Sequence, residues 1–267
     1  MRILVVTSLY APWTLGGAEM VAESSAQALA DLGNEIYVLT LSPNQETSHD
    51  HGDGYKIRRV PLANIYPLQE MNRATTLQRI QWHIKDRWNV EMKNTFASEL
   101  KLIQPDVALL HNIAGFSISI YDELVTASVP FIQVLHDHYF GCLYSIMYRN
   151  GKTCKDQCIR CSIMRRKHLP VTRLANGVVG VSSYILDKIK SLGYFLGTPA
   201  HVIRNLSAAP KEPDLSAAFW RKPETRGCII GFLGGLTESK GIFDLLLAFQ
   251  DAARPIDRLV VAGNTST

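Results

Sequence analysis

Long apolar runs are missing from this chain of 267 residues, and none reaches the length that a bilayer-crossing helix needs. Residues 1–6 carry one positive charge and are followed by Tyr10, Pro12 and two glycines instead of a small-residue cleavage site. This pattern predicts a first β-strand and excludes a signal peptide. Only 19% of the residues are charged, and the net charge of +4 is too small to indicate a nucleic-acid partner. We therefore expect a cytoplasmic protein.

Cysteine is also scarce, with five residues, but four of them fall within the segment 142–161. Thiols stay reduced in the cytoplasm, so metal ligation and core packing are considered before disulfides. Cys142, Cys154, Cys158 and Cys161 have the spacing C-x11-C-x3-C-x2-C in a polar segment, which suits tetrahedral zinc. The spacing predicts structural zinc that orders this loop. Free or partly oxidised thiols and an iron–sulfur cluster are the alternatives.

What is present in the sequence is an alternation of strands and helices. Residues 2–7 form a short apolar run, residues 18–32 have helical spacing that ends at Gly33, and residues 35–41 form a second apolar run. This order predicts a βαβ unit and hence a parallel sheet with right-handed crossovers. Further strands are expected at residues 57–60, 107–110, 131–135, 177–181 and 202–203. The fold class is therefore α/β, with a Rossmann-like parallel sheet and helices on both faces.

Residues 75–103 are predicted to form one long amphipathic helix. Its apolar side chains recur every four positions, at Ile80, Ile84, Trp88, Met92, Phe96 and Leu100. Its other face is basic and carries Arg79, Lys85, Arg87, Lys93 and Lys101. That face either meets solvent or contacts a membrane surface.

The chain divides at a stretch that contains Pro210, Pro213 and Pro223. We expect a first domain at 1–206, a linker at 207–226 and the beginning of a second α/β domain at 227–267. The second part holds a strand, a helix and one more strand. Because a parallel sheet of two strands cannot bury its faces, this domain is expected to be incomplete, and to lean on the first domain, another chain or further residues.

Candidate chemistry follows the strands, since ligands of doubly wound sheets bind beyond the carboxyl ends of the strands. Gly16 and Gly17 precede a helix whose free N–H groups suit an anion, although the G-x-G-x-x-G spacing of a dehydrogenase is absent. His111-Asn112 and His136-Asp137 follow two later strands, and both histidines are expected to face one crevice. Asp137 is a candidate base or hydroxyl-orienting group. The alternative for each histidine is a hydrogen-bonded packing residue.

Three weak motifs occur in order: P-x-x-x-G-G-A-E at 12–19, Val-Ile-Arg-Asn at 202–205, and a glycine turn at 234–241 that contains Lys240. Together they resemble the retaining glycosyltransferases of family 4, which have two Rossmann-like domains facing across a cleft (GT-B fold). The resemblance covers essentially the whole chain. Without the resemblance, a surface lysine before an ordinary capped helix is the better interpretation of Lys240.

The resemblance implies transfer of a sugar from a nucleotide-sugar to an acceptor hydroxyl with retention, with no catalytic metal. Gly16, Gly17 and Lys240 would meet the donor phosphates, and His136 would lie near the reacting sugar with Asp137 beside it. Glu19, His111 and Asn112 are the expected acceptor-binding residues. A saccharide or lipid-linked acceptor of surface polysaccharide or glycolipid synthesis is expected, and the basic Arg165-Arg166-Lys167 fits a peripheral contact with the inner membrane face.

Two departures from the family pattern qualify these expectations. Gly235 stands where the family has an arginine beside the lysine, and the family's paired glutamates would lie beyond Thr267. One alternative is therefore a degenerate transferase, or an acceptor-binding subunit completed by a partner chain. A zinc-ordered interaction module that has kept only the fold is a further alternative.

Overall fold

The computed structural model describes residues 1–13, 16–71, 73–205 and 227–263. The chain divides into two compact units, of which the first comprises Met1–Met147 and Cys154–Ala208 and the second comprises Tyr148–Thr153 and Ala209–Thr267. The predicted linker at 207–226 lies outside the described residues, so the boundaries expected for the two domains stay predictions.

An eight-stranded sheet forms the centre of the first unit, in the order β10-β9-β6-β5-β1-β2-β4-β3. The strands are β1 (Arg2–Val6), β2 (Glu35–Leu41), β3 (Ser48–His51), β4 (Lys56–Val60), β5 (Val107–Leu110), β6 (Phe131–Leu135), β9 (Gly177–Gly180) and β10 (Ala200–Val202). All pairs are parallel except β3 with β4. The predicted parallel sheet is confirmed, and the antiparallel edge strand β3 is an addition that its polar sequence did not indicate.

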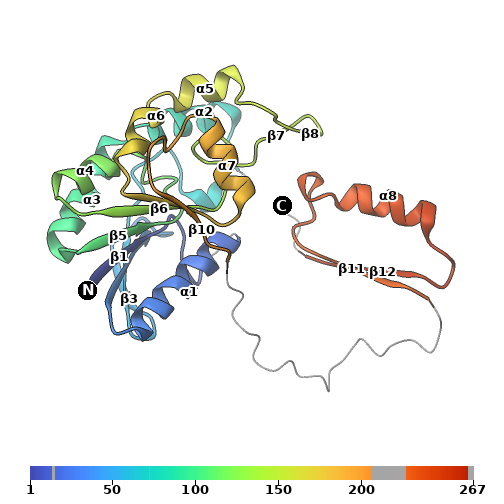
Figure 1. The fold of residues 1–267 in the computed structure, drawn as a ribbon, viewed down its shortest axis with the longest axis horizontal. Helices are drawn as coiled ribbons and strands as arrows, with labels where there is room; N and C mark the ends of the chain where they lie inside the picture. The colour runs from blue at the N-terminus through green and yellow to red at the C-terminus, as the bar shows by residue number, and fades with distance from the viewer. Residues whose placement is uncertain (14–15, 72, 206–226, 264–267) are drawn as a thin grey trace. The chain divides into compact units, whose positions relative to one another are not determined.

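Helices cover both faces of this sheet (Figure 1). They are α1 (Gly17–Asp31), α2 (Thr76–Asp86), α3 (Val90–Ile103), α4 (Ile120–Thr126), α5 (Ile159–Arg165), α6 (His168–Val171) and α7 (Ser183–Ser191), with 3-10 turns η1 (Leu68–Glu70) and η2 (Thr172–Leu174). Because side chains alternate along a strand, β1 places Leu4 and Val6 in a core with α3 and α4, and Ile3 and Val5 in a second core with α1.

The segment 75–103 is two helices, and the prediction of one long helix was wrong. α2 ends at Asp86 and α3 starts after Asn89, whose side chain accepts a hydrogen bond from the N–H of Met92 at 3.1 Å. This side-chain cap satisfies a free donor at the new helix start. The predicted apolar stripe is buried only in α3, whereas Ile80 and Ile84 of α2 are exposed.

The described part of the second unit is small. Strands β11 (Ile229–Leu233) and β12 (Arg258–Ala262) pair in parallel, joined through η4 (Glu238–Lys240) and α8 (Ile242–Ala252). A hairpin of β7 (Tyr148–Arg149) and β8 (Lys152–Thr153) also belongs to this unit. Its turn is Asn150-Gly151, with φ of +52° and +72°, which suits the residues that tolerate the left-handed region.

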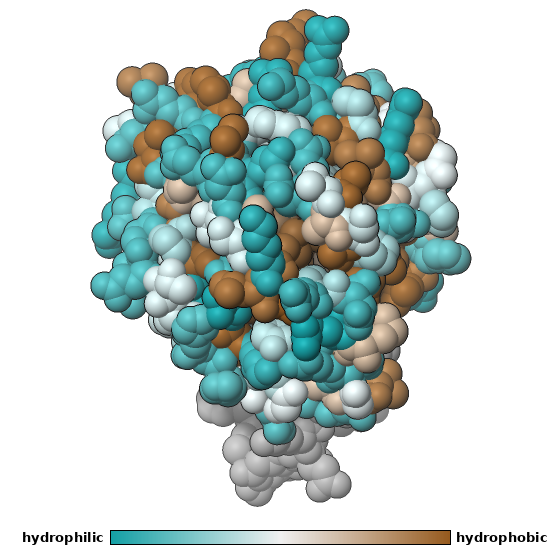
Figure 2. Space-filling view, turned by 90° about the vertical axis from the view of Figure 1, so that its left-hand side faces the viewer, coloured by the Kyte–Doolittle hydropathy of each residue, from teal (hydrophilic) through white to brown (hydrophobic). Residues whose placement is uncertain are grey.

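The surface of the molecule is mixed. On the face shown in Figure 2, hydrophilic side chains cover most of the area and hydrophobic ones lie scattered among them. Within the described residues, none of the helices has both the length and the apolar character required to cross a bilayer.

Candidate functional site

The carboxyl ends of β1, β5 and β6 lie side by side, since β1 pairs with β5 and β5 pairs with β6 in parallel. The order of the strands also reverses here, because the chain continues from β1 to β2 on one side of β1 and later returns to β5 on its other side. Crevices of doubly wound sheets form at such a switch point. The loops that follow these three strands therefore enclose the candidate site.

His111 and His136 meet at this edge, as the sequence predicts for two histidines that follow neighbouring strands. Nδ1 of His111 lies 2.9 Å from Nε2 of His136, and the two rings stack with centroids 5.1 Å apart. Burial lowers the pKa of His111 to about 3, with a further contribution from His136, and burial lowers the pKa of His136 to about 4. Both rings are therefore neutral near pH 7, and one donates the proton that the other accepts.

Asp137 lies next to this pair and is partly buried. Its Oδ1 accepts a hydrogen bond of 2.7 Å from the backbone N–H of Tyr139. Burial raises the pKa of Asp137 to about 6, although the N–H of Tyr139 and the charge of Arg165 oppose the shift. The carboxyl group thus changes charge close to physiological pH, as a group that handles a hydroxyl proton should.

Asn112 shapes the loop after β5. Its side-chain oxygen accepts the N–H of Ala114 at 3.0 Å, and the hydroxyl of Ser8 donates to the carbonyl of Ala114 at 2.6 Å. These contacts hold the loop after β5 against the loop after β1. The acceptor-binding role of Asn112 stays a prediction.

Gly16 and Gly17 stand at the start of α1, as predicted, and both are exposed. The carboxylate of Glu19 turns back and accepts the N–H of Gly16 at 2.8 Å, so it serves as the anion at this helix start. Glu19 is buried, with 4% of its surface exposed. The phosphate-binding role of the glycines and the acceptor-binding role of Glu19 both stay predictions.

Two hollows border His111. A small one of about 10 Å³ is lined by His111, Gln133, His136, Asp137 and Tyr139 among others. A larger one of about 290 Å³ lies between α1 and the sheet, with Leu109, Ile132, Val134 and Val179 on its apolar floor. Ile203, Arg204 and Asn205, which belong to one of the three motifs, line the same hollow.

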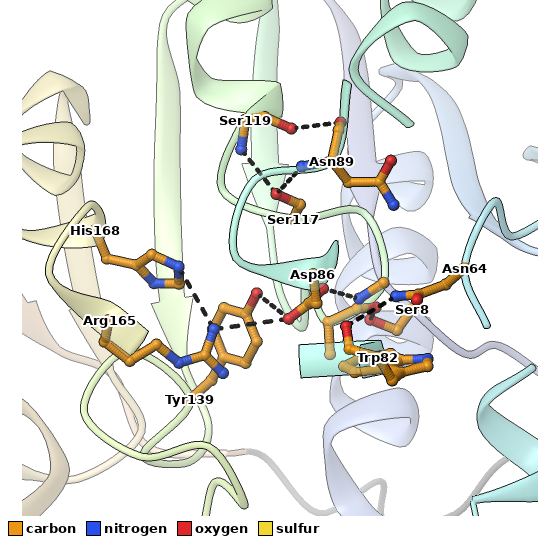
Figure 3. A network of polar contacts seen from close by, with 12 residues as sticks. Ser8, Asn64, Trp82, Asp86, Asn89, Ser117, Ser119, Tyr139, Arg165 and His168 are labelled. Carbon is orange, nitrogen blue, oxygen red and sulfur yellow. Dashed lines mark hydrogen bonds and ion pairs between the residues drawn. The ribbon is translucent and has the colours of Figure 1, made fainter. Parts of the chain in front are cut away.

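A buried polar network behind the site was not predicted (Figure 3). Asp86, Tyr139, Arg165 and His168 are joined in it by hydrogen bonds, an ion pair and ring contacts. Arg165 has 1% of its surface exposed, so its assignment to a membrane-facing basic cluster was wrong. No local pattern signals this pair, because Asp86 and Arg165 are far apart in the sequence and each has charged residues beside it.

The four clustered cysteines pack in one small core with Leu143 and Met147. Cys142 and Cys161 are buried, and their thiols are hydrogen-bonded to each other; this contact lowers the pKa of Cys142, helped by three backbone N–H groups. None of these four described residues takes part in a disulfide bond. Across the described residues, no three Cys, His, Asp or Glu side chains are placed to hold a metal ion, so the structure gives structural zinc no support.

Lys240 ends η4 in the second unit and is exposed. Gly241, which follows it, has φ of +75° and is the N-cap residue of α8. The lysine therefore stands immediately before a helix, as the sequence predicts. Its donor-binding role stays a prediction.

Comparison with known proteins gives a consistent result. The model of the family described as "Glycosyltransferase Family 4" matches residues 15–206, which is more than half of the chain. An "Uncharacterized 42.6 kDa protein in cps region" of Klebsiella pneumoniae is 27% identical over 241 residues, covering 90% of this chain and 63% of the relative. The chain thus spans less than two thirds of that relative.

Solved structures show the same fold. Sucrose-phosphate synthase from Thermosynechococcus elongatus matches with a TM-score of 0.62 at 10% identity, over 97% of this chain and 61% of that one. The catalytic domain of starch synthase IV from Arabidopsis thaliana matches with a TM-score of 0.61 at 11% identity, over 100% and 69%. The chain therefore has the Rossmann-like α/β architecture of GT-B glycosyltransferases.

The burial of the two histidines predicts how the groups of the site titrate. Since the folded-state pKa of each ring lies below the ordinary value of about 6.5, neither ring should titrate between about pH 8 and pH 5 in ¹H–¹⁵N NMR spectra, whereas the Asp137 carboxyl should titrate near pH 6. The stabilisation from keeping the pair neutral is complete above the unfolded pKa and is lost as the pH falls through 4 towards 3. A ring of the pair with a midpoint near 6.5 would contradict the geometry.

Proposed function

This chain belongs to glycosyltransferase family 4, and from that membership we propose that it transfers a sugar from a nucleotide-sugar to an acceptor hydroxyl, with retention at the anomeric carbon. The observation that carries the proposal is the meeting of His111, His136 and Asp137 at the carboxyl ends of β5 and β6, inside the segment matched by the family. No catalytic metal is required, since neutral donors and helix N-termini can stabilise the developing charge.

The donor proposal draws on the structural relatives. Starch synthase IV was solved with ADP and acarbose, and Phytolacca americana UGT2, which matches with a TM-score of 0.54, with UDP-2-fluoro-glucose. We assign the donor phosphates of this chain to Gly16 and Gly17 at the start of α1 and to Lys240 before α8. Because the chain spans 61–69% of the two enzymes compared above, the substrates of the whole protein are part of the proposal.

The acceptor proposal follows from the chemistry of the first unit. Neutral His136 can exchange a hydrogen bond with a sugar hydroxyl, and Asp137 can accept a hydroxyl proton once it is ionised above about pH 6. Glu19, His111 and Asn112 are the further residues that we propose to bind the acceptor. A saccharide acceptor of surface polysaccharide synthesis is supported by the description of the Klebsiella pneumoniae relative as a protein of the cps region.

Replacing His136 should remove transfer. His136→Ala deletes the imidazole nearest to the expected sugar position, and we expect turnover to fall by about 10²–10⁴-fold, the range for a positioned acid–base group. Isothermal calorimetry with common nucleotide-sugars should show donor binding within about threefold of wild type. The matched control is His51→Ala, because His51 is exposed on β3. Undiminished turnover in His136→Ala would refute the role of this residue.

Peripheral membrane contact is proposed for the α2–α5 surface, defined as Leu77, Ile80, Ile84, Tyr144, Ile159 and Ile163. All six are exposed, and Tyr144 joins the two helices because its ring contacts both His83 of α2 and Arg160 of α5. Hydrophobic side chains also reach the surface near the top of Figure 2, the end at which α2 and α5 lie in Figure 1. Arg160, Arg166 and Lys167 are exposed cations in the same region, which suits anionic headgroups.

The membrane proposal predicts cosedimentation with vesicles that contain anionic phospholipid and weaker binding to neutral ones. Ile159→Ser with Ile163→Ser should weaken binding at least about tenfold, since burying one such side chain stabilises by about 1.5–3 kcal/mol. Leu102→Ser is the control, because Leu102 is 68% exposed on α3. Equal binding of all three proteins would contradict this surface.

Structural zinc at Cys142, Cys154, Cys158 and Cys161 is kept as a separate proposal, supported by the spacing of the four cysteines in the sequence alone. Metal analysis of protein purified without chelator should give about one zinc per chain. Cys161→Ser should lose it, and Cys228→Ser should retain it because Cys228 lies in the other unit. Folded protein that contains no zinc would end the proposal.

A further inference from the structure

Asp86 joins three segments of the first unit that are distant in sequence (Figure 3). Its Oδ1 accepts the backbone N–H of Gly115, in the loop after β5, at 2.7 Å. Its Oδ2 accepts the hydroxyl of Tyr139, in the loop after β6, at 2.9 Å. The same oxygen lies 3.6 Å from Nη1 of Arg165, the last residue of α5. One carboxylate therefore ties the two loops that carry His111 and His136 to a helix behind them.

Arg165 is held on several sides. Its guanidinium carbon lies 4.1 Å from the centroid of the Tyr139 ring, and its Nη1 lies 3.4 Å from Nε2 of His168. Its Nε has no hydrogen-bond partner among the described residues. The side chain of Asp86 is fully buried, and its burial raises its pKa against the opposing charge of Arg165.

A buried ion pair such as Asp86–Arg165 contributes little net free energy to the stability of the folded state. Removing two charges from water costs several kcal/mol for each ion, and apolar side chains of similar volume often replace such pairs without loss. The surroundings here are rich in apolar side chains, including Phe140 and Tyr194. A second role for the Asp86–Arg165 pair is therefore expected.

The contacts of Tyr139 indicate this role, because both its hydroxyl and its backbone N–H are hydrogen-bonded. Its hydroxyl donates to Asp86, and its backbone N–H donates to Oδ1 of Asp137. Tyr139 is three residues after His136, so fixing its ring and its backbone fixes the short loop 136–139. An ion pair thus joins Arg165 to Asp86, and two hydrogen bonds lead from Asp86 through Tyr139 to the carboxylate at the candidate site.

We propose that Asp86 and Arg165 are positioning residues for the transfer reaction, which hold His136 and Asp137 in their reactive arrangement through Tyr139. The inference rests on the proposed function. Arg165 also acts on Asp137 by its charge. The other groups that influence Asp137 are Cys142, in the loop after β6, and Glu19 of α1, which both oppose its ionisation.

Two variants test the positioning role. Tyr139→Phe removes only the hydroxyl that reaches Asp86, and we expect kcat to fall by about 10–100-fold with little change in the donor KM, since small displacements of reacting groups have effects of this size. Tyr55→Phe is the matched control, because the hydroxyls of Tyr10 and Tyr55 are hydrogen-bonded at 3.0 Å in the core on the α1 face. It should lower the unfolding midpoint similarly and leave kcat unchanged.

The double variant Asp86→Asn with Arg165→Gln removes both charges; it keeps the shape of residue 86 and shortens the side chain at residue 165. Because Arg165 lowers the pKa of Asp137, its loss should raise that pKa above about 6 and move the rise of activity to higher pH. The ¹³C-carboxyl titration of Asp137 in the free chain measures this shift without any substrate. If the double variant does not fold, Tyr139→Phe decides the question by kcat.

Different results would contradict the proposed transfer function and the positioning role of Asp86 and Arg165. Wild-type chain that transfers no sugar would defeat the proposed function, while a shifted Asp137 titration in the double variant would still support the connection through Arg165. Wild-type kcat in Tyr139→Phe would overturn the positioning role. An Asp137 titration that does not move in a folded double variant would overturn the electrostatic part.

Discussion

A parallel strand can be followed by another parallel strand only if the chain crosses back over the sheet, and this constraint places every loop of interest at one edge. β1, β5 and β6 are neighbours in the sheet although they are separated by long stretches of sequence. Their carboxyl ends therefore gather His111, His136 and Asp137 at one edge of the sheet. The helices α3 and α4 on one face and α1 on the other fill the space beside the sheet. These helices leave the carboxyl edge of the sheet uncovered, and the candidate site lies at that edge.

Much of this architecture was predictable from the sequence because it depends on local patterns. Apolar runs marked the parallel strands β1, β2, β5 and β6 closely, since a strand buried on both faces is mostly apolar. The break between α2 and α3 was not predictable from periodicity, because Trp88 and Met92 continue the four-residue repeat across it. It depends on Asn89 as a cap and on Asp86, whose partners lie far along the chain. The edge strand β3 has four polar residues and carries no apolar signal at all.

The sequence predicted which residues belong to the candidate site, but it did not predict most of the contacts that these residues make. Histidines after neighbouring strands were expected in one crevice, and they meet at 2.9 Å. By contrast, the side-chain oxygens of Glu19 and Asn112 accept backbone N–H groups of nearby residues, Gly16 and Ala114, which residue type alone does not reveal. Arg165 shows the same limit: a basic triplet in sequence suggests a charged surface, but the helix turns one of the three into the core. Long-range pairing decides such cases, and a single sequence does not contain it.

The contact between the two imidazoles also determines where their protons are. Nε2 of His111 is buried and has no hydrogen-bond partner among the described residues. A buried N–H without an acceptor is rarer and costlier than a buried lone pair without a donor, so the network assigns the proton of His111 to Nδ1. That N–H then donates to Nε2 of His136, which leaves the proton of the second ring on Nδ1. The ring therefore presents an N–H, and not a lone pair, to whatever approaches its other side, and its tautomer is set by a residue on the neighbouring strand.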